Sequence, residues 1–133
     1  KKTVGNEKII FPKKNCEFVI NNQKISIQII SKEEFDKITK VNKLLVKNAL
    51  DYDIIHGETQ FRTRMSGDVF KQFGRGVTKS LKKLFNESKI PSEKRDNIII
   101  LANGSNVLWI QDFGVSQIAA VTSNTKEVAV IFI

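Results

Sequence analysis

The sequence predicts an α+β domain in which a mainly antiparallel β-sheet system carries two principal helices. Segments 16–30 and 59–64 alternate apolar and polar residues, which is the period of strands that bury one face. Segments 31–43 and 79–88 instead carry apolar residues at helical spacing behind a capping hydroxyl. From residue 98 onward the chain is again rich in strand-forming residues. Strands of this kind with only two long helical patterns indicate the α+β class.

Segment 16–30 predicts a β-hairpin. Asn21 and Asn22 lie between its two β-type runs, and asparagine tolerates the positive φ of a tight turn. In the second run Ile25, Ile27 and Ile29 alternate with polar residues, so this side of the strand is expected to face the core.

The first helix is expected to begin after Ser31. Glu34 follows three residues later, at the spacing of a capping box. Phe35, Ile38 and Val41 then recur at three-residue steps, which predicts a helix to about residue 43 with this stripe in the core.

A short strand is expected over 59–64. Its alternation turns Phe61 and Thr63 to one side and Arg62 and Arg64 to the other, so the two arginines are predicted to share one face.

The second helix is expected over 79–88, with Thr78 as its cap. Leu81, Leu84 and Phe85 form its buried stripe, and the lysines of the segment lie largely outside that stripe.

The last third is expected to be mostly strand. Pro91, with its ring-fixed φ, predicts one helical turn through Arg95. Strands 98–101 and 107–110 flank a turn, and a final strand covers 127–133.

The 133 residues predict a single domain over 1–133, with a formal net charge of +8 that favours polyanionic partners. Residues 61–96 hold 10 basic and 4 acidic groups, whereas 1–60 hold 11 and 8, and 97–133 hold 1 and 2. The positive charge is therefore concentrated in the middle of the chain. On charge alone, a solvated lysine-rich surface remains an equal alternative.

Cysteine content and hydropathy favour a cytoplasmic protein. Cys16 is the only cysteine and has no partner for an internal disulfide, and no apolar run is long enough for a membrane span. The chain begins at Lys1 without an initiator methionine, so we expect a fragment of a longer protein.

Few residues support catalysis. His56 is the only histidine and is expected in an exposed turn, and one histidine with one cysteine makes no zinc-ligand set. Gly74-Arg75-Gly76 lacks the Lys-Ser/Thr ending of a phosphate-binding loop. We therefore expect no catalytic residue, no metal and no cofactor in this chain.

A basic constellation is the strongest functional signal, because guanidinium and ammonium groups fit phosphate oxygens. It is spread over a strand, a glycine loop and the second helix. The candidate nucleic-acid-binding residues are Arg62, Arg64, Lys71, Arg75, Lys79, Lys82 and Lys83.

Part of the sequence resembles the C-terminal domain of bacterial tRNA(Ile)-lysidine synthetases, most strongly over residues 50–133. The ordered residues that carry the resemblance are RTRMSGDVF from Arg62 to Phe70, Gly74, Lys79, Leu81-Lys82, Phe85, Lys89-Ile90-Pro91 and Arg95-Asp96.

The resemblance implies a mixed α/β fold, also similar to a domain of the phenylalanyl-tRNA synthetase β subunit, that recognises the tRNA(Ile) acceptor stem. It implies a parent ligase that uses ATP and Mg²⁺ to attach lysine to the wobble cytidine, with an N-terminal catalytic domain as the other partner. The family's catalytic loop, Ser-Gly-Gly-x-Asp-Ser, is absent here.

Contact roles are carried over to part of the basic constellation, and Asp68 is expected to orient an arginine or the turn. Two alternatives remain, a docking module whose basic face packs on a sibling domain and a generic RNA-binding module. The residues carried over are Arg62, Arg64, Asp68, Lys79, Lys82 and Lys83.

Overall fold

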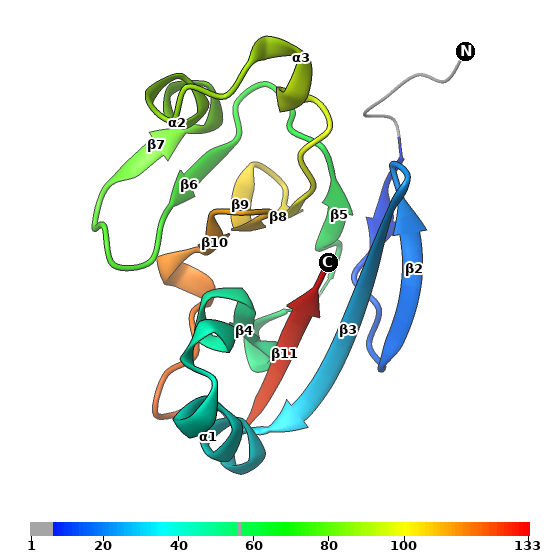
Figure 1. Ribbon diagram of the computed structural model, residues 1–133, viewed down its shortest axis with the longest axis vertical. Coiled ribbons are helices and arrows are strands. Elements are labelled where there is room, and N and C mark those ends of the chain that lie inside the picture. Colours follow the sequence, from blue (N-terminus) through cyan, green and yellow to red (C-terminus); the bar gives the residue numbers. More distant parts are fainter. Residues whose placement is uncertain (1–6, 56) are drawn as a thin grey trace.

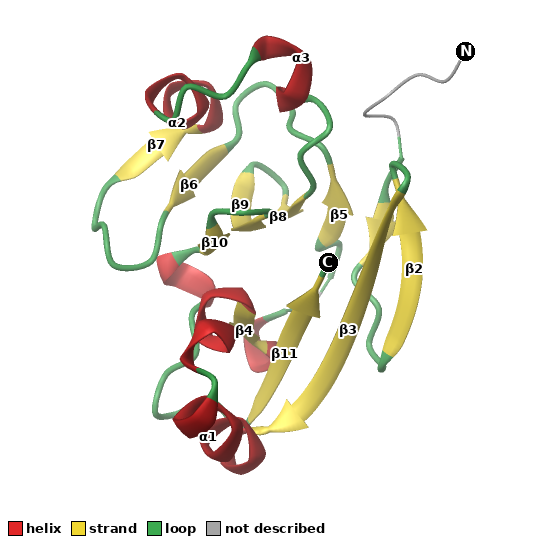
Figure 2. Cartoon of the chain, in the orientation of Figure 1, coloured by secondary structure: helices red, strands yellow, loops and turns green. Residues whose placement is uncertain are grey.

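The computed structural model describes residues 7–55 and 57–133, which form two β-sheets with short helices at their edges (Figures 1 and 2). The first sheet is antiparallel throughout. Its strands, in spatial order, are β2 (Cys16–Ile20), β3 (Gln23–Ser31), β11 (Glu127–Phe132) and β4 (Ala49–Asp51). The predicted α+β class is confirmed.

The second sheet is larger and carries the basic middle of the chain. One of its strand pairs, β6 with β9, is parallel and the others are antiparallel. Its path is β1 (Ile9–Ile10), β5 (Gln60–Arg62), β8 (Ile100–Asn103), β9 (Asn106–Ile110), β6 (Val69–Lys71) and β7 (Thr78–Ser80), with β10 (Gly114–Val115) also beside β9.

The predicted hairpin forms as β2 and β3. Asn21 and Asn22 make its turn at φ 53° and 66°, the left-handed region that asparagine tolerates. Ile25 and Ile27 are buried, which confirms the core-facing side of β3.

Helix α1 (Lys32–Val41) begins where it was predicted. The Ser31 hydroxyl accepts a hydrogen bond from the Glu34 amide at 3.1 Å, and Phe35 is buried. The prediction that Val41 belongs to the core stripe is wrong, because its side chain is 90% exposed. Two three-residue steps rotate a position about 120° away around a helix of 3.6 residues per turn.

Helix α2 (Leu81–Glu87) begins two residues later than predicted. Its cap is Ser80, whose hydroxyl accepts from the Lys83 amide at 3.1 Å, while Thr78 and Lys79 belong to β7. The buried stripe of this helix is as predicted.

Shorter helices complete the chain, and the single turn expected after Pro91 is confirmed. These are η1 (Lys43–Asn48), η2 (Tyr52–Ile54), α3 (Ser92–Arg95) and η3 (Gln117–Ala119). Within the described residues, no helix combines the length and apolarity that crossing a bilayer requires.

The largest apolar cluster draws side chains from both sheets, with Ile27 and Ala129 from one and Phe61 and Trp109 from the other. A second cluster lies under α2, where Leu84 and other stripe residues pack on the larger sheet. This packing fixes the position of α2 and leaves its opposite side in solvent.

Candidate nucleic-acid interface

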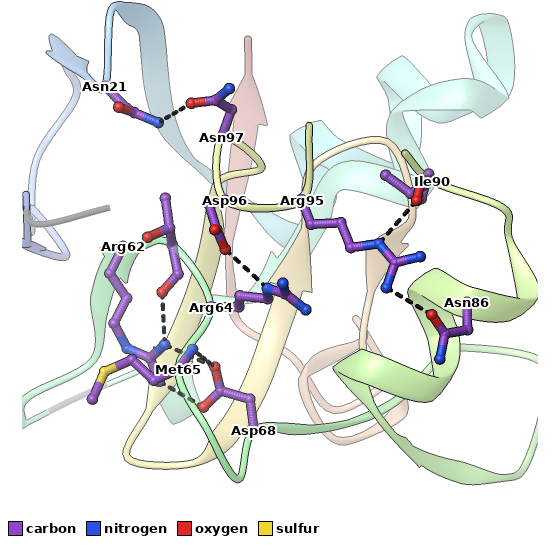
Figure 3. Close-up of polar contacts among 11 residues, drawn as sticks. Asn21, Arg62, Arg64, Met65, Asp68, Asn86, Ile90, Arg95, Asp96 and Asn97 are labelled. Carbon is purple, nitrogen blue, oxygen red and sulfur yellow. Dashed lines mark hydrogen bonds and ion pairs between the residues drawn. The ribbon is translucent and has the colours of Figure 1, made fainter. Parts of the chain in front are cut away.

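The turn between β5 and β6 is built on a buried ion pair. The Arg62 guanidinium donates to both carboxylate oxygens of Asp68, each at 2.9 Å, and the two side chains are 4% and 2% exposed. Arg62 also donates to the carbonyls of Thr63 at 2.9 Å and Gly104 at 2.8 Å. Asp68 in turn accepts from the Met65 amide at 2.7 Å (Figure 3). These bonds hold the turn in one conformation.

The predicted shared face of Arg62 and Arg64 is wrong. Arg62 points into the turn, whereas Arg64 lies beyond the end of β5 and donates to Asp96 at 3.1 Å (Figure 3). With four hydrogen bonds and almost no exposed surface, Arg62 is not available to an outside phosphate in this conformation.

Arg64 is half-buried at the start of α2. Its guanidinium carbon lies 5.8 Å from the centre of the Phe85 ring, within cation–π range. Together with Lys82 it lines a hollow of about 470 Å³ between the turn at 64–68 and α2. Asp68 and Asp96 line the same hollow, so its charge is mixed, and Asp96 already pairs with Arg64.

Lys79 lies on β7, not on a helix as predicted. Its ammonium pairs with Glu87 at 2.5 Å. The hydrogen bond from Lys79 lowers the pKa of the Glu87 carboxyl below its ordinary value. The positive charge of Lys79 is therefore partly compensated within the chain.

Lys82 and Lys83 are exposed on the outer side of α2. At the start of this helix the Leu81 amide donates to the Asp68 carbonyl and the Lys83 amide donates to Ser80, so neither amide is free for an outside anion.

The remaining two cations of the predicted constellation belong to the β6–β7 hairpin. Arg75 is exposed in its loop, between Gly74 and Gly76 at positive φ. Lys71 pairs with Thr78 in the register that places Lys79 opposite Phe70. Because successive residues of a strand point to opposite faces, Lys71 projects from the other side of the sheet from Lys79.

The structure therefore gathers five of the seven predicted cations around α2. We name Arg64, Arg75, Lys79, Lys82 and Lys83 the α2 cationic set. Two of its members have carboxylate partners, Asp96 and Glu87, that sequence reasoning missed. Asp96 lies 32 residues after Arg64, so no local pattern signals that pair, and Glu87 lies 8 residues after Lys79 but on a different element.

Metal-ligating side chains do not cluster in the described part of the chain. No group of three or more His, Cys, Asp and Glu side chains there could hold a metal ion. His56 lies outside the described residues, so its expected place in a turn stays a prediction.

These observations describe a small α+β fold in which five basic side chains lie around one short helix. A sequence model of the family described as the TilS substrate C-terminal domain matches residues 59–132. The chain therefore belongs to this family, and the resemblance found in the sequence is confirmed.

Curated relatives carry the name tRNA(Ile)-lysidine synthase. The chain is 36% identical over 98 residues to the protein of Caldanaerobacter subterraneus subsp. tengcongensis, covering 74% of this chain and 21% of the relative. It is 34% identical over 109 residues to the Clostridium tetani protein, and this match covers 82% of this chain and 23% of the relative. The matched region thus spans about a fifth to a quarter of the length of these relatives.

A solved structure has the same fold. The crystal structure of a TilS C-terminal domain superposes with a TM-score of 0.72 at 22% identity, covering 94% of this chain and 93% of that one. At this identity the likeness shows the fold alone.

Proposed function

We propose that this chain is a non-catalytic tRNA-binding domain that recognises the acceptor stem of tRNA(Ile). The parent would be a cytoplasmic tRNA(Ile)-lysidine synthase whose N-terminal catalytic domain uses ATP and Mg²⁺ to attach lysine to the wobble cytidine. The α2 cationic set is the observation that carries the proposal, and membership of the TilS family supports it.

The arrangement favours recognition of a duplex by the position of its phosphates. The set combines two guanidinium and three ammonium groups, which fit phosphate oxygens, and it lies around one short helix packed on the larger sheet. Arg75, Lys82 and Lys83 are exposed, so they can contact RNA directly. Arg64 and Lys79 must first break their ion pairs with Asp96 and Glu87. Arg62 and Asp68 hold the turn that carries Arg64.

Affinity of the 133-residue chain for an RNA hairpin, measured against salt concentration, tests the proposal. The logarithm of the association constant falls by up to about 0.9 per logarithm of salt for each phosphate contact. Three direct contacts predict a slope of about −2.7, and all five predict about −4.5.

Lys82→Ala should reduce this slope by about one unit, and Lys126→Ala, which removes an exposed lysine outside the set, should leave it unchanged. A Lys82→Ala loss confined to one of two different stem sequences would contradict phosphate-based recognition. If Lys82→Ala and Lys126→Ala reduced the salt slope equally, the α2 cationic set would not be the RNA interface.

Docking on a sibling domain is the second candidate, and a separate surface favours it. Leu44 and Phe73 are 81% and 47% exposed and line a hollow of about 350 Å³ with Phe113. Exposed apolar surface of this kind is common at interfaces. A docking module predicts negligible hairpin affinity at any salt concentration, so the same titration separates the two candidates.

A further inference from the structure

A second hollow borders the C-terminal half of α2. Its volume is about 310 Å³, and its lining is mixed: Phe70, Leu84 and Phe113 give it an apolar side, which we call its floor, and Glu87, the partner of Lys79, adds a carboxylate. Arg75 and Lys79, both members of the α2 cationic set, stand on its rim. The volume lies at the lower end of the range for small-molecule sites, which suits a ligand group no larger than one nucleotide.

Hydrogen bonds hold the walls of this hollow in place. The Gln72 side chain donates to the Phe113 carbonyl at 3.0 Å, and the Phe73 amide donates to the Val115 carbonyl at 3.1 Å. The Phe113 ring packs against Phe85 with ring centres 5.7 Å apart. The floor and the β6–β7 loop are therefore fixed to each other before any ligand binds.

We propose that this hollow binds one unpaired nucleotide at the end of the RNA duplex, an inference that rests on the proposed function. A nucleobase presents flat apolar faces, which match the floor, and its phosphate matches Arg75. A bare anion would gain nothing from the apolar floor, and a wholly apolar ligand would desolvate the charged rim. The hollow and the phosphate-contacting lysines share α2, so one RNA molecule can engage both.

Three hairpin RNAs with the same stem test the inference on the 133-residue chain. One is blunt, one ends in a single unpaired 3′ nucleotide, and one ends in an abasic nucleotide that supplies the same phosphate without a base. Stacking of one base typically contributes about 1–3 kcal/mol, so we expect the base-bearing overhang to bind at least about fivefold more tightly than the abasic one. With 2-aminopurine at the overhang, fluorescence should change on binding.

Ser88→Trp fills the hollow without removing a charge or a core side chain, since Ser88 is exposed at its wall. We expect this variant to lose the fivefold gain and to keep its affinity for the blunt hairpin. Ser92→Trp, on exposed α3 and outside the hollow, should keep both. Val77→Asp provides a second test, because Val77 lines the hollow, is 55% exposed and can carry a charge without unfolding the chain.

The outcomes separate the two proposals. Equal binding of base and abasic overhangs, with the blunt hairpin still bound, overturns the nucleotide site and leaves the proposed function standing. A gain that survives both Ser88→Trp and Val77→Asp places the base elsewhere and also overturns the site. Failure to bind any hairpin overturns the proposed function and this inference with it.

Discussion

Replacing Asp68 with alanine should strongly destabilise the domain. The substitution leaves the Arg62 guanidinium, 4% exposed, without the carboxylate that accepts two of its hydrogen bonds. The Met65 amide loses its acceptor as well. Removing one partner of a buried ion pair costs more than the pair contributes, because an uncompensated charge remains in the interior.

The expected loss of unfolding free energy is about 3–5 kcal/mol. With an unfolding entropy of about 2.1 cal/mol/K per residue, each kcal/mol lowers the Tm of a 133-residue chain by about 3.6 °C. The expected fall in Tm is therefore about 11–18 °C. A chain of this length has a total stability of about 7–20 kcal/mol, so the variant should still fold at low temperature.

Urea unfolding and thermal melting of Asp68→Ala measure this loss, and Asp96→Ala is the matched control. Asp96 makes the same type of pair with Arg64, but its side chain is 66% exposed, so its removal should cost at most about 1 kcal/mol. A loss below about 1 kcal/mol for Asp68→Ala, or equal losses in the two variants, would refute the argument from burial.

Three further outcomes are expected. Glu87→Gln should raise affinity for an RNA hairpin because it releases the lysine that Glu87 pairs with. Glu33→Gln, which removes one negative charge on α1, should raise affinity less. Equal gains in the two variants would mean that net charge alone sets the affinity. Gly114→Ala should destabilise the chain by calorimetry more than Gly104→Ala, because both glycines have positive φ but only the added Cβ at Gly114 meets a neighbour, a lysine carbon at 2.6 Å. Phe85→Ala should lower the unfolding free energy by about 3–5 kcal/mol, and an unchanged urea midpoint would contradict the fully buried position of this ring.

Local patterns predicted the elements whose signals lie within a few residues. The Asn21-Asn22 turn, the Ser31 cap and the buried stripe of α2 each depend on side chains close in sequence. The start of α2 was missed because Thr78 and Ser80 are both capping residues, and the pairing of β7 with β6 decided between them. That pairing is a tertiary contact between strands of three residues, too short for an alternating pattern to show.

The charges were harder to place than the elements. Alternation assigned Arg62 to a solvent face, since a charged side chain is expected outside unless a partner compensates it. The partner, Asp68, becomes adjacent only after the chain turns, and the Gly104 carbonyl comes from 42 residues away. Lys71 and Lys79 belong to one basic constellation in the sequence, but the β6–β7 hairpin, which no local pattern signals, places them on opposite faces of the sheet.

The pairing of charges also bears on how tightly the domain can grip RNA. If only Arg75, Lys82 and Lys83 contact phosphates without first breaking an ion pair, the electrostatic contribution to affinity is small, and affinity falls less steeply with salt than it would with five contacts. Phosphate contacts fix the position of the protein on a duplex but do not discriminate between base sequences. Binding through these contacts alone therefore depends mainly on where a duplex lies. A nucleotide held in the hollow beside α2 would add the missing information, because it is present only where the duplex ends. The two proposals together predict that the domain senses where a stem ends, so lengthening the paired stem while deleting its unpaired nucleotide should lower affinity although phosphates are added.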